Sequence, residues 1–349
     1  MDRNKTLIAA TAAFALGCSA AGAAFAADRI TIQTHFNPTL SVIGEASKNF
    51  TDNLEGLAGD DLRIRFYEAG KLVPTLETFD AVKNGTLDAV WGWPGYFMGK
   101  IPALTLFAAV PFGPDADETV AWMMQGDGGK LAQEIMAKHG VHGIFCGVIG
   151  PEASGWFKKE IKTLDDLKGL KVRYAGLGGE VLSKLGASVT VLAAGEIFPN
   201  LEKGVIDATE FSMPSVDKAL GFYKIAQHYY FPGWHQPGST AFFMVNQEKW
   251  DSLSEANKTR IKVACDANVA WELSRGIGEQ AAAMAYYGEQ GTNIHTWPAE
   301  IIEAFREKTA EVMAEQSAAD ADFKRVYENQ QAYLKKVRAW SGPAAMPQN

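Results

Sequence analysis

The sequence predicts an α/β protein built from two similar lobes, and the main evidence is a repeat within the chain. Residues 77–89 (ETFDAVKNGTLDA) recur as residues 196–208 (EIFPNLEKGVIDA), 119 positions later and without a gap. Upstream of each copy, a strand, a helix and a second strand are expected in the same order. Because alternating strands and helices favour parallel sheets covered by helices, two copies of this unit predict two lobes.

Each copy is expected to contain five elements in the order βαβαβ. The elements before the repeated segment are a strand at 30–36, a helix at 42–57 and a strand at 62–67 in the first copy, and a strand at 170–174, a helix at 179–185 and a strand at 189–192 in the second. The repeated segment itself predicts a short helix, then Gly85 or Gly204 at the left-handed cap position, then a strand that opens with Asp-Ala.

After the second copy, the chain is predicted to return to the first lobe and then to become helical. A strand at 239–246 crosses back, and helices follow at 255–287, with interruptions at Gly276 and Gly278, at 299–316 and at 322–340. The predicted division is a signal peptide at 1–27, a first lobe at 28–150 with about 238–285, a second lobe at 151–237 with about 286–320, and a C-terminal helix and tail at 321–349. Lobes joined by crossing strands can close over a ligand as on a hinge.

Residues 1–27 have the pattern of a cleaved signal peptide. Arg3 and Lys5 precede an apolar stretch, and residues 24–26 (AFA) fit the small-x-small cleavage rule. The mature chain is therefore expected outside the cytoplasm. It retains Cys146 and Cys265, which could pair in an oxidising compartment, although two buried free thiols are the favoured interpretation.

The composition argues against several classes of partner. The chain has a formal net charge of −8 and no basic run, so nucleic acid and anionic membrane surfaces are poor candidates. No stretch after the signal segment is long and apolar enough to cross a bilayer. If the protein serves transport, the membrane component is another chain.

The predicted topology directs attention to the carboxyl ends of the strands, where open α/β sheets bind ligands. Trp91 and Glu210 follow the repeated strands at matched positions, so they should border a shared cleft from opposite lobes. Arg173 ends the strand at 170–174, where its guanidinium can bind a ligand carboxylate through two parallel hydrogen bonds. Trp93 and Tyr96 lie in an adjoining loop and could form an apolar wall against a small ligand.

Three polar residues near predicted strand ends suggest a cation site. Glu152, Glu210 and Gln236 supply oxygen atoms of the kind that bind Na⁺ or Ca²⁺, and such an ion could contact the ligand carboxylate on its other side. A glycosidase also needs two carboxylates, so Glu152 and Glu210 leave a periplasmic hydrolase open as an alternative. The sequence has no Gly-x-Ser-x-Gly elbow and no cysteine spacing typical of zinc.

The C-terminal segment predicts one amphipathic helix. Its apolar stripe, with residues three and four apart, consists of Phe323, Val326, Gln330, Tyr333, Val337 and Trp340. The stripe must be covered, either by the lobe of the same chain or by a second protomer.

Several stretches together resemble the solute-binding proteins of TRAP transporters, in the branch that binds α-keto acids and lactate. They are residues 65–74 (RFYEAGKLVP), 94–102 (PGYFMGKIP), 109–114 (AVPFGP), 171–181 (KVRYAGLGGEV), 204–210 (GVIDATE) and 229–235 (YYFPGWH). The resemblance implies a two-lobed periplasmic binding protein fold, in which each lobe has a mixed, mostly parallel sheet flanked by helices and a long C-terminal helix follows. It covers essentially the whole mature chain.

The resemblance also implies a function and a set of site residues. Members of the family are periplasmic receptors, not enzymes, that close on a 2-oxo or 2-hydroxy acid and deliver it to a permease of one small and one large membrane subunit. By this resemblance Arg173 binds the carboxylate, while Glu152, Glu210, the Phe211 carbonyl and Gln236 hold a bridging cation. A homodimer that exchanges the C-terminal helix is implied as well. A sensory receptor for the same acid stays open.

The sequence departs from the family pattern at the cation site. Gln is usual at the position of Glu152 and Glu at that of Gln236, so the formal charge is kept but moved across the site. Phe211 replaces a more usual Trp and should alter the pocket wall. The identity of the cation and of the acid is therefore open.

Overall fold

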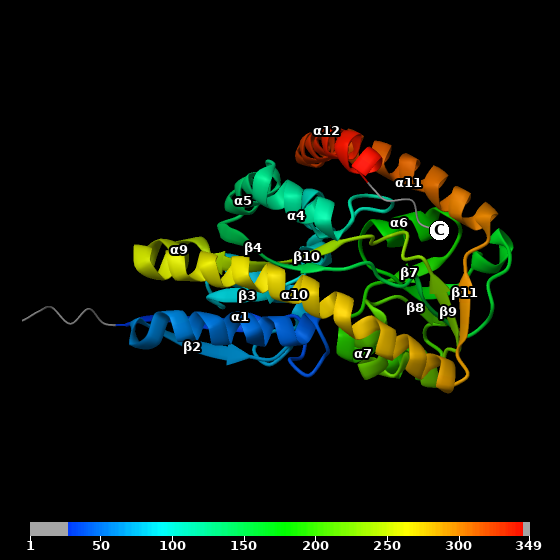
Figure 1. Cartoon of the computed structure of the whole chain (residues 1–349), viewed down its shortest axis with the longest axis horizontal. Coiled ribbons are helices and arrows are strands. Elements are labelled where there is room, and N and C mark those ends of the chain that lie inside the picture. The colour runs from blue at the N-terminus through cyan, green and yellow to red at the C-terminus, as the bar shows by residue number, and fades with distance from the viewer. Residues whose placement is uncertain (1–26, 345–349) are drawn as a thin grey trace, which may run out of the picture.

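The computed structural model describes residues 27–344, so the predicted signal segment lies almost entirely outside the described residues. Two sheets dominate the fold, and helices cover both of them (Figure 1). The first sheet contains β1 (Asp28–Thr34), β2 (Leu62–Tyr67), β3 (Ala89–Gly92), β4 (Val141–Ile149) and β10 (Ser239–Asn246). Its strand order is β2-β1-β3-β10-β4, with β10 antiparallel to both neighbours. The predicted return of the chain at 239–246 is thus confirmed.

The second sheet has six strands. They are β5 (Gly155–Phe157), β6 (Lys171–Arg173), β7 (Ser188–Thr190), β8 (Ala208–Thr209), β9 (His228–Phe231) and β11 (Asn293–Thr296). The order is β11-β9-β5-β8-β6-β7, and β5 is antiparallel to β8 and β9. Both sheets are therefore mixed, because in each one an antiparallel strand joins the repeated parallel unit to the rest of the sheet.

The two copies of the internal repeat form equivalent parts of the two sheets, as predicted. In the first sheet β2, β1 and β3 run parallel, and in the second β7, β6 and β8 do the same in the same relative order. The repeated helices are α2 (Thr78–Lys83) and α7 (Ala194–Glu202). Gly85 and Gly204 follow them with φ of 72° and 73°, the left-handed conformation that glycine adopts without strain. The two-lobed α/β fold class is confirmed.

The helices agree with the expected pattern, apart from some boundaries. The remaining α-helices are α1 (Ile43–Ala58), α3 (Thr105–Ala108), α4 (Ala116–Gln125), α5 (Gly128–Ala137), α6 (Gly176–Lys184), α8 (Pro214–Leu220), α9 (Gln247–Ser252), α10 (Glu255–Glu289), α11 (Ala299–Ala319) and α12 (Ala321–Ala344). The predicted interruption at Gly276 and Gly278 is wrong, since α10 runs unbroken. α10 runs alongside both lobes (Figure 1), and Gly276 lies close to Met213 of the second lobe and Val42 of the first.

The expectation of two free thiols is also wrong. Cys146 on β4 and Cys265 on α10 form a disulfide, with their Cα atoms 4.2 Å apart. The cause is the packing of α10 along β4, which places two inward-facing cysteines opposite each other. A bond between residues far apart in sequence restricts the unfolded chain and is suited to an oxidising compartment.

The C-terminal helix folds back onto its own chain. α12 contacts α3, α4 and α5 of the first lobe, and Phe323, Val326 and Gln330 are buried there. The far end of the predicted stripe is open, because Trp340 is 73% exposed. Among residues 27–344, none of the helices is both long enough and apolar enough to cross a membrane.

Glu272 makes the stability of this fold depend on pH. It is fully buried on α10 against Gly147 of β4, and burial raises the pKa of its carboxyl well above the ordinary value. Below the ordinary pKa of a glutamate, the side chain is neutral in the folded and the unfolded chain. As pH rises from that value towards the raised pKa, only the unfolded chain ionises, so the free energy of unfolding falls.

We therefore expect Glu272→Leu to stabilise the protein, and to do so more at pH 8 than at pH 5. The difference should be on the order of 1 kcal/mol or more, since each unit of pKa shift corresponds to about 1.4 kcal/mol. Urea unfolding at both pH values measures it. Glu289→Leu, at an exposed position of the same helix, is the control. An equal effect of Glu272→Leu at both pH values would contradict the prediction.

Candidate ligand and cation site

A small cavity lies between the two lobes, at the carboxyl ends of the repeated strands. The first lobe lines it with mainly apolar residues, namely Phe36, Ile43, Trp93, Tyr96 and Ile149. The second lobe lines it with mainly polar residues, namely Glu152, Arg173, Ala175, Glu210, Phe211, Ser212 and Gln236. One wall can therefore pack against carbon atoms while the other binds charge.

Arg173 and Glu210 come together because their strands are neighbours. β6 and β8 are parallel with Arg173 opposite Thr209, so the residue after β8 lies beside the end of β6. The Arg173 Nη1 donates hydrogen bonds to the Glu210 carbonyl oxygen (2.6 Å) and to Glu210 Oε2 (2.9 Å). Arg173 is only 2% exposed, so this ion pair is buried. The hydrogen bond to the Glu210 carbonyl oxygen fixes the orientation of the guanidinium.

Glu152 adds a second buried carboxylate from the segment that crosses between the sheets. Ser212 Oγ donates a hydrogen bond to Glu152 Oε1 at 2.9 Å, whereas Glu152 Oε2 is buried without a hydrogen-bond partner. Burial, together with the nearby charge of Glu210, raises the pKa of Glu152 well above its ordinary value. Burial acts on Glu210 in the same direction, but Arg173 and His235 outweigh it and hold the pKa of Glu210 below its ordinary value.

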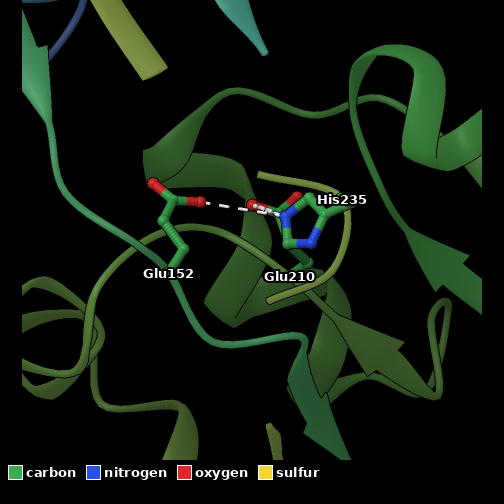
Figure 2. Close-up of side chains that lie close together, drawn as sticks. All are labelled: Glu152, Glu210 and His235. Carbon is green, nitrogen blue, oxygen red and sulfur yellow. Dashed lines mark ion pairs between the residues drawn. The ribbon is translucent and has the colours of Figure 1, made fainter. Parts of the chain in front are cut away.

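His235 completes a group that the sequence analysis did not identify. Figure 2 shows one ring nitrogen facing both carboxylates; this Nε2 lies 3.8 Å from Glu152 Oε2 and 3.6 Å from Glu210 Oε1. The three side chains are buried, and one ligand atom from each lies within 4.8 Å of the others. The only signal in the sequence was the position of His235 beside Gln236.

The predicted aromatic residues differ in their placement. Trp93 and Tyr96 line the cavity, whereas Trp91 does not and is fully buried on β3 in the core below. Trp91 differs from the expectation because it lies within β3 rather than after it, so its side chain packs in the core beside Phe36, whereas Trp93 follows the end of the strand. His35 was missed by the sequence analysis; its Nδ1 accepts a hydrogen bond from the Trp93 backbone N–H at 3.1 Å and so positions this wall.

Gln236 and Phe211 also lie where the sequence analysis expected them, at the cavity. The Phe211 ring lies under the Arg173 guanidinium, with Cζ 5.2 Å from the ring centroid. A cation over an aromatic face is stabilised by the charge distribution of the ring. Six of the seven predicted contact residues and Glu210 thus converge on one cavity.

Comparison with known proteins agrees with this arrangement. The family model described as bacterial extracellular solute-binding protein, family 7 (DctP) matches residues 33–320. The monocarboxylate 2-oxoacid-binding periplasmic protein of Nostoc sp. strain PCC 7120 is 40% identical over 280 residues, which are 80% of this chain and 77% of that protein.

Two solved structures of TRAP solute-binding proteins show the same fold. The protein from Bordetella bronchiseptica RB50, a dimer with calcium and picolinate, has a TM-score of 0.88 and 31% identity, over 90% of this chain and 94% of that one. The protein from Pseudoalteromonas atlantica T6c, with sodium and pyruvate, has a TM-score of 0.85 and 34% identity, over 90% of this chain and 96% of that one. The chain therefore belongs to the DctP family, the bacterial extracellular solute-binding proteins of family 7.

Proposed function

We propose that this protein is the periplasmic receptor of a TRAP transporter and binds a small monocarboxylic 2-oxo acid, together with a cation, in the cavity between its lobes. It delivers the acid to a membrane permease of a small and a large subunit. The predicted signal segment at 1–27 directs the chain to the periplasm, and the mature protein acts there without catalysing a reaction. N-terminal sequencing of the periplasmic protein tests this assignment.

The charge of the cavity carries the proposal. Arg173 is balanced by Glu210, so with His235 neutral, ionised Glu152 leaves the group with one excess negative charge. A ligand carboxylate would add a second. Burial makes such an excess costly, and a cation is the simplest group that removes it. Because its pKa is raised, Glu152 tends to keep its proton when no ion is bound. A bound cation would replace that proton.

The residues present fit a cation. Glu152 Oε2 is a buried carboxylate oxygen with no hydrogen-bond partner among residues 27–344, so it is an available ligand. Glu152, Glu210, the Phe211 carbonyl and Gln236 would hold the ion, and the ion would polarise and orient the acid. The bound calcium and sodium of the two solved relatives support this proposal. Arg173 binds the acid carboxylate, and Trp93, Tyr96 and Phe36 restrict the rest of the ligand to a small, flat group.

The geometry favours a receptor over a hydrolase. Glu210 is held by Arg173 and Glu152 by Ser212, and both converge with His235 on one point. A glycosidase instead places its two carboxyl groups on either side of a sugar, at least about 5 Å apart. The close approach of the two carboxylates supports a shared ion over a hydrolytic pair.

A thermal-shift screen of small carboxylates, with and without Ca²⁺ or Na⁺, tests the function. A ligand that binds only the folded chain raises its melting temperature, by mass action. We expect pyruvate or a related 2-oxo acid to do so, and more strongly with the cation present. The proposed function is wrong if no small carboxylate stabilises the mature chain under either condition.

We also propose that the protein forms a homodimer through the exposed end of α12. The dimer described for the Bordetella bronchiseptica relative and the exposure of Trp340 support it. Light scattering at micromolar concentration should give a dimer for the mature chain and a monomer for Trp340→Glu. This point variant is preferable to deletion from Asp322, because deletion would also uncover the first lobe. A monomeric wild-type chain would contradict the proposal.

A further inference from the structure

Three arginines gather on one face of the first sheet, far from the ligand cavity. Arg29 on β1 lies directly opposite Arg63 on β2, and Arg65 lies opposite Thr31. Because side chains alternate along a strand, the three arginines project from the same face of two neighbouring strands. They are exposed and border a hollow of about 400 Å³. We call these three residues the arginine cluster.

The helices of the first lobe leave this hollow open. Ile30, Ile32 and Leu62 alternate with the arginines and belong to the core beneath α1, on the opposite face of the strands. α2 and α5 lie on the same side of the sheet as the arginine cluster, but they pack farther along it, on β3, β10 and β4. Figure 1 shows β2 at the edge of the first lobe, beside α1.

The arginine cluster has no partner of opposite charge among residues 27–344. No carboxylate oxygen in this part of the chain lies within 4.0 Å of the arginine nitrogens. Asp61, the acidic residue just before β2, pairs with Arg260 of α10 instead. Like charges directly opposite each other on neighbouring strands are destabilising. The pair of Arg29 and Arg63 therefore weakens the fold unless something else balances it.

Protection of the sheet edge does not account for the whole cluster. Charged residues on an edge strand prevent it from pairing with another chain, and β2 is an edge strand. This explains Arg63 and Arg65. Arg29, however, lies on β1, which pairs with a strand on each side. A charge at that position protects no edge, so a ligand for the three guanidinium groups is expected, and such groups bind carboxylates well.

We propose that the arginine cluster docks an acidic periplasmic segment of the permease. This inference rests on the proposed function, because it concerns the membrane partner of that function. Membrane proteins concentrate Lys and Arg in their cytoplasmic loops, so carboxylates in periplasmic loops have few neighbouring positive charges. The receptor has a formal net charge of −8, so its surface as a whole repels such a loop. One local positive region then determines where the loop binds and how the receptor is oriented.

The position of the arginine cluster suits docking without blocking the ligand. The hollow is formed by residues 29–31 and 63–65, which precede the carboxyl ends of β1 and β2, whereas the ligand cavity lies beyond the carboxyl ends. A docked segment would hold the first lobe and leave the second lobe free to open. An anionic lipid surface fits less well, because membrane-binding clusters usually contain about four to eight basic residues.

Pyruvate uptake into vesicles that contain the permease tests the inference. The small and large subunits are reconstituted in phosphatidylcholine vesicles, and the concentration of mature receptor that gives half-maximal uptake is measured. The double variant Arg63→Glu with Arg65→Glu should raise this concentration on the order of 10-fold, because it repels the acidic segment. Its affinity for pyruvate, measured by calorimetry, should equal that of the wild type. Arg63→Lys with Arg65→Lys keeps the charge and should restore most of the uptake.

Folding and overall charge are controlled separately. Arg63→Glu places opposite charges at the pair with Arg29, so the double glutamate variant should melt no lower than the wild type. Lys159→Glu with Lys203→Glu, at exposed positions of the second lobe, changes the net charge by the same amount and should leave uptake unchanged. The inference is overturned if the double glutamate variant has wild-type uptake, or if the lysine variant loses as much uptake as it does.

Two further measurements separate the alternatives. The mature receptor should not sediment with phosphatidylglycerol vesicles that lack the permease. Sedimentation that the double glutamate variant loses would assign the arginine cluster to the lipid surface and overturn the inference. The proposed function fails separately, if no small carboxylate binds to the wild type. Surface plasmon resonance with the detergent-solubilised permease still tests docking in that case, because only binding that the double glutamate variant loses supports the arginine cluster.

Discussion

Arg173→Lys should weaken binding of the small carboxylate on the order of 10-fold or more. The lysine ammonium keeps the positive charge but lacks the planar fork that makes two parallel hydrogen bonds to a carboxylate. It also cannot maintain both contacts of Arg173 Nη1 to Glu210, so the remaining charge is less well placed. Isothermal titration with pyruvate measures the effect on affinity, and a thermal melt shows that the variant is folded.

Arg275→Lys is the matched control for this prediction. Arg275 also makes two contacts to one carboxylate, that of Glu45, but it does so on the surface. An exposed pair of this kind contributes about 1 kcal/mol or less, so acid binding should be unchanged. If Arg173→Lys binds pyruvate as tightly as the wild type does, Arg173 does not hold the carboxylate.

Glu210→Gln should lower acid affinity to a similar extent and remove the effect of the cation. Glutamine preserves the shape of the side chain and can accept a hydrogen bond from Arg173, but it removes a charged ligand of the ion. The loss of charge also removes the buried ion pair that orients the Arg173 guanidinium. Pyruvate titrations at several concentrations of Ca²⁺ or Na⁺ measure both effects.

The diagnostic result for Glu210→Gln is the dependence on the cation. The wild-type affinity for the acid should rise with cation concentration, while that of the variant should be weak and nearly constant. Glu160→Gln, a surface carboxylate of the same lobe, should behave as the wild type. Cation dependence that persists at full strength in Glu210→Gln would show that Glu210 is not a ligand of the ion.

Much of the fold could be predicted from the sequence, because the repeat is both long and regular. Segments 77–89 and 196–208 identify a glycine with positive φ in each copy and a strand directly after it. The three parallel strands of each copy have the same relative order in the two sheets. Element boundaries were less certain; α6 begins at Gly176 rather than at 179, because its glycines do not reveal the start of a helix.

Features that depend on packing between distant segments could not be predicted. The pairing of Cys146 with Cys265 depends on the direction in which α10 crosses β4. The course of α12 back over the first lobe likewise depends on the shape of α3, α4 and α5. An apolar stripe shows that a helix must be covered, but it does not show which surface covers it.

The same distinction applies to the site. Arg173 and Glu210 could be predicted because each follows a strand, and neighbouring parallel strands place their ends together. Trp91 also follows from the repeat, but a position two residues further, Trp93, is the one at the cavity. His235 had no signal beyond its position beside Gln236, and His35 had none, because their contacts depend on chain paths that only the folded protein fixes.

The central claim is that a cation and a small carboxylate bind together in the cavity between the lobes. Calorimetric titration of pyruvate into the mature, metal-free chain tests it most directly, with Ca²⁺ or Na⁺ restored in parallel experiments. We predict weak or undetectable binding without the cation and saturable binding at one site per chain with it. Equally tight binding in the absence of any cation, or no binding of pyruvate and its small 2-oxo analogues in its presence, would contradict the claim.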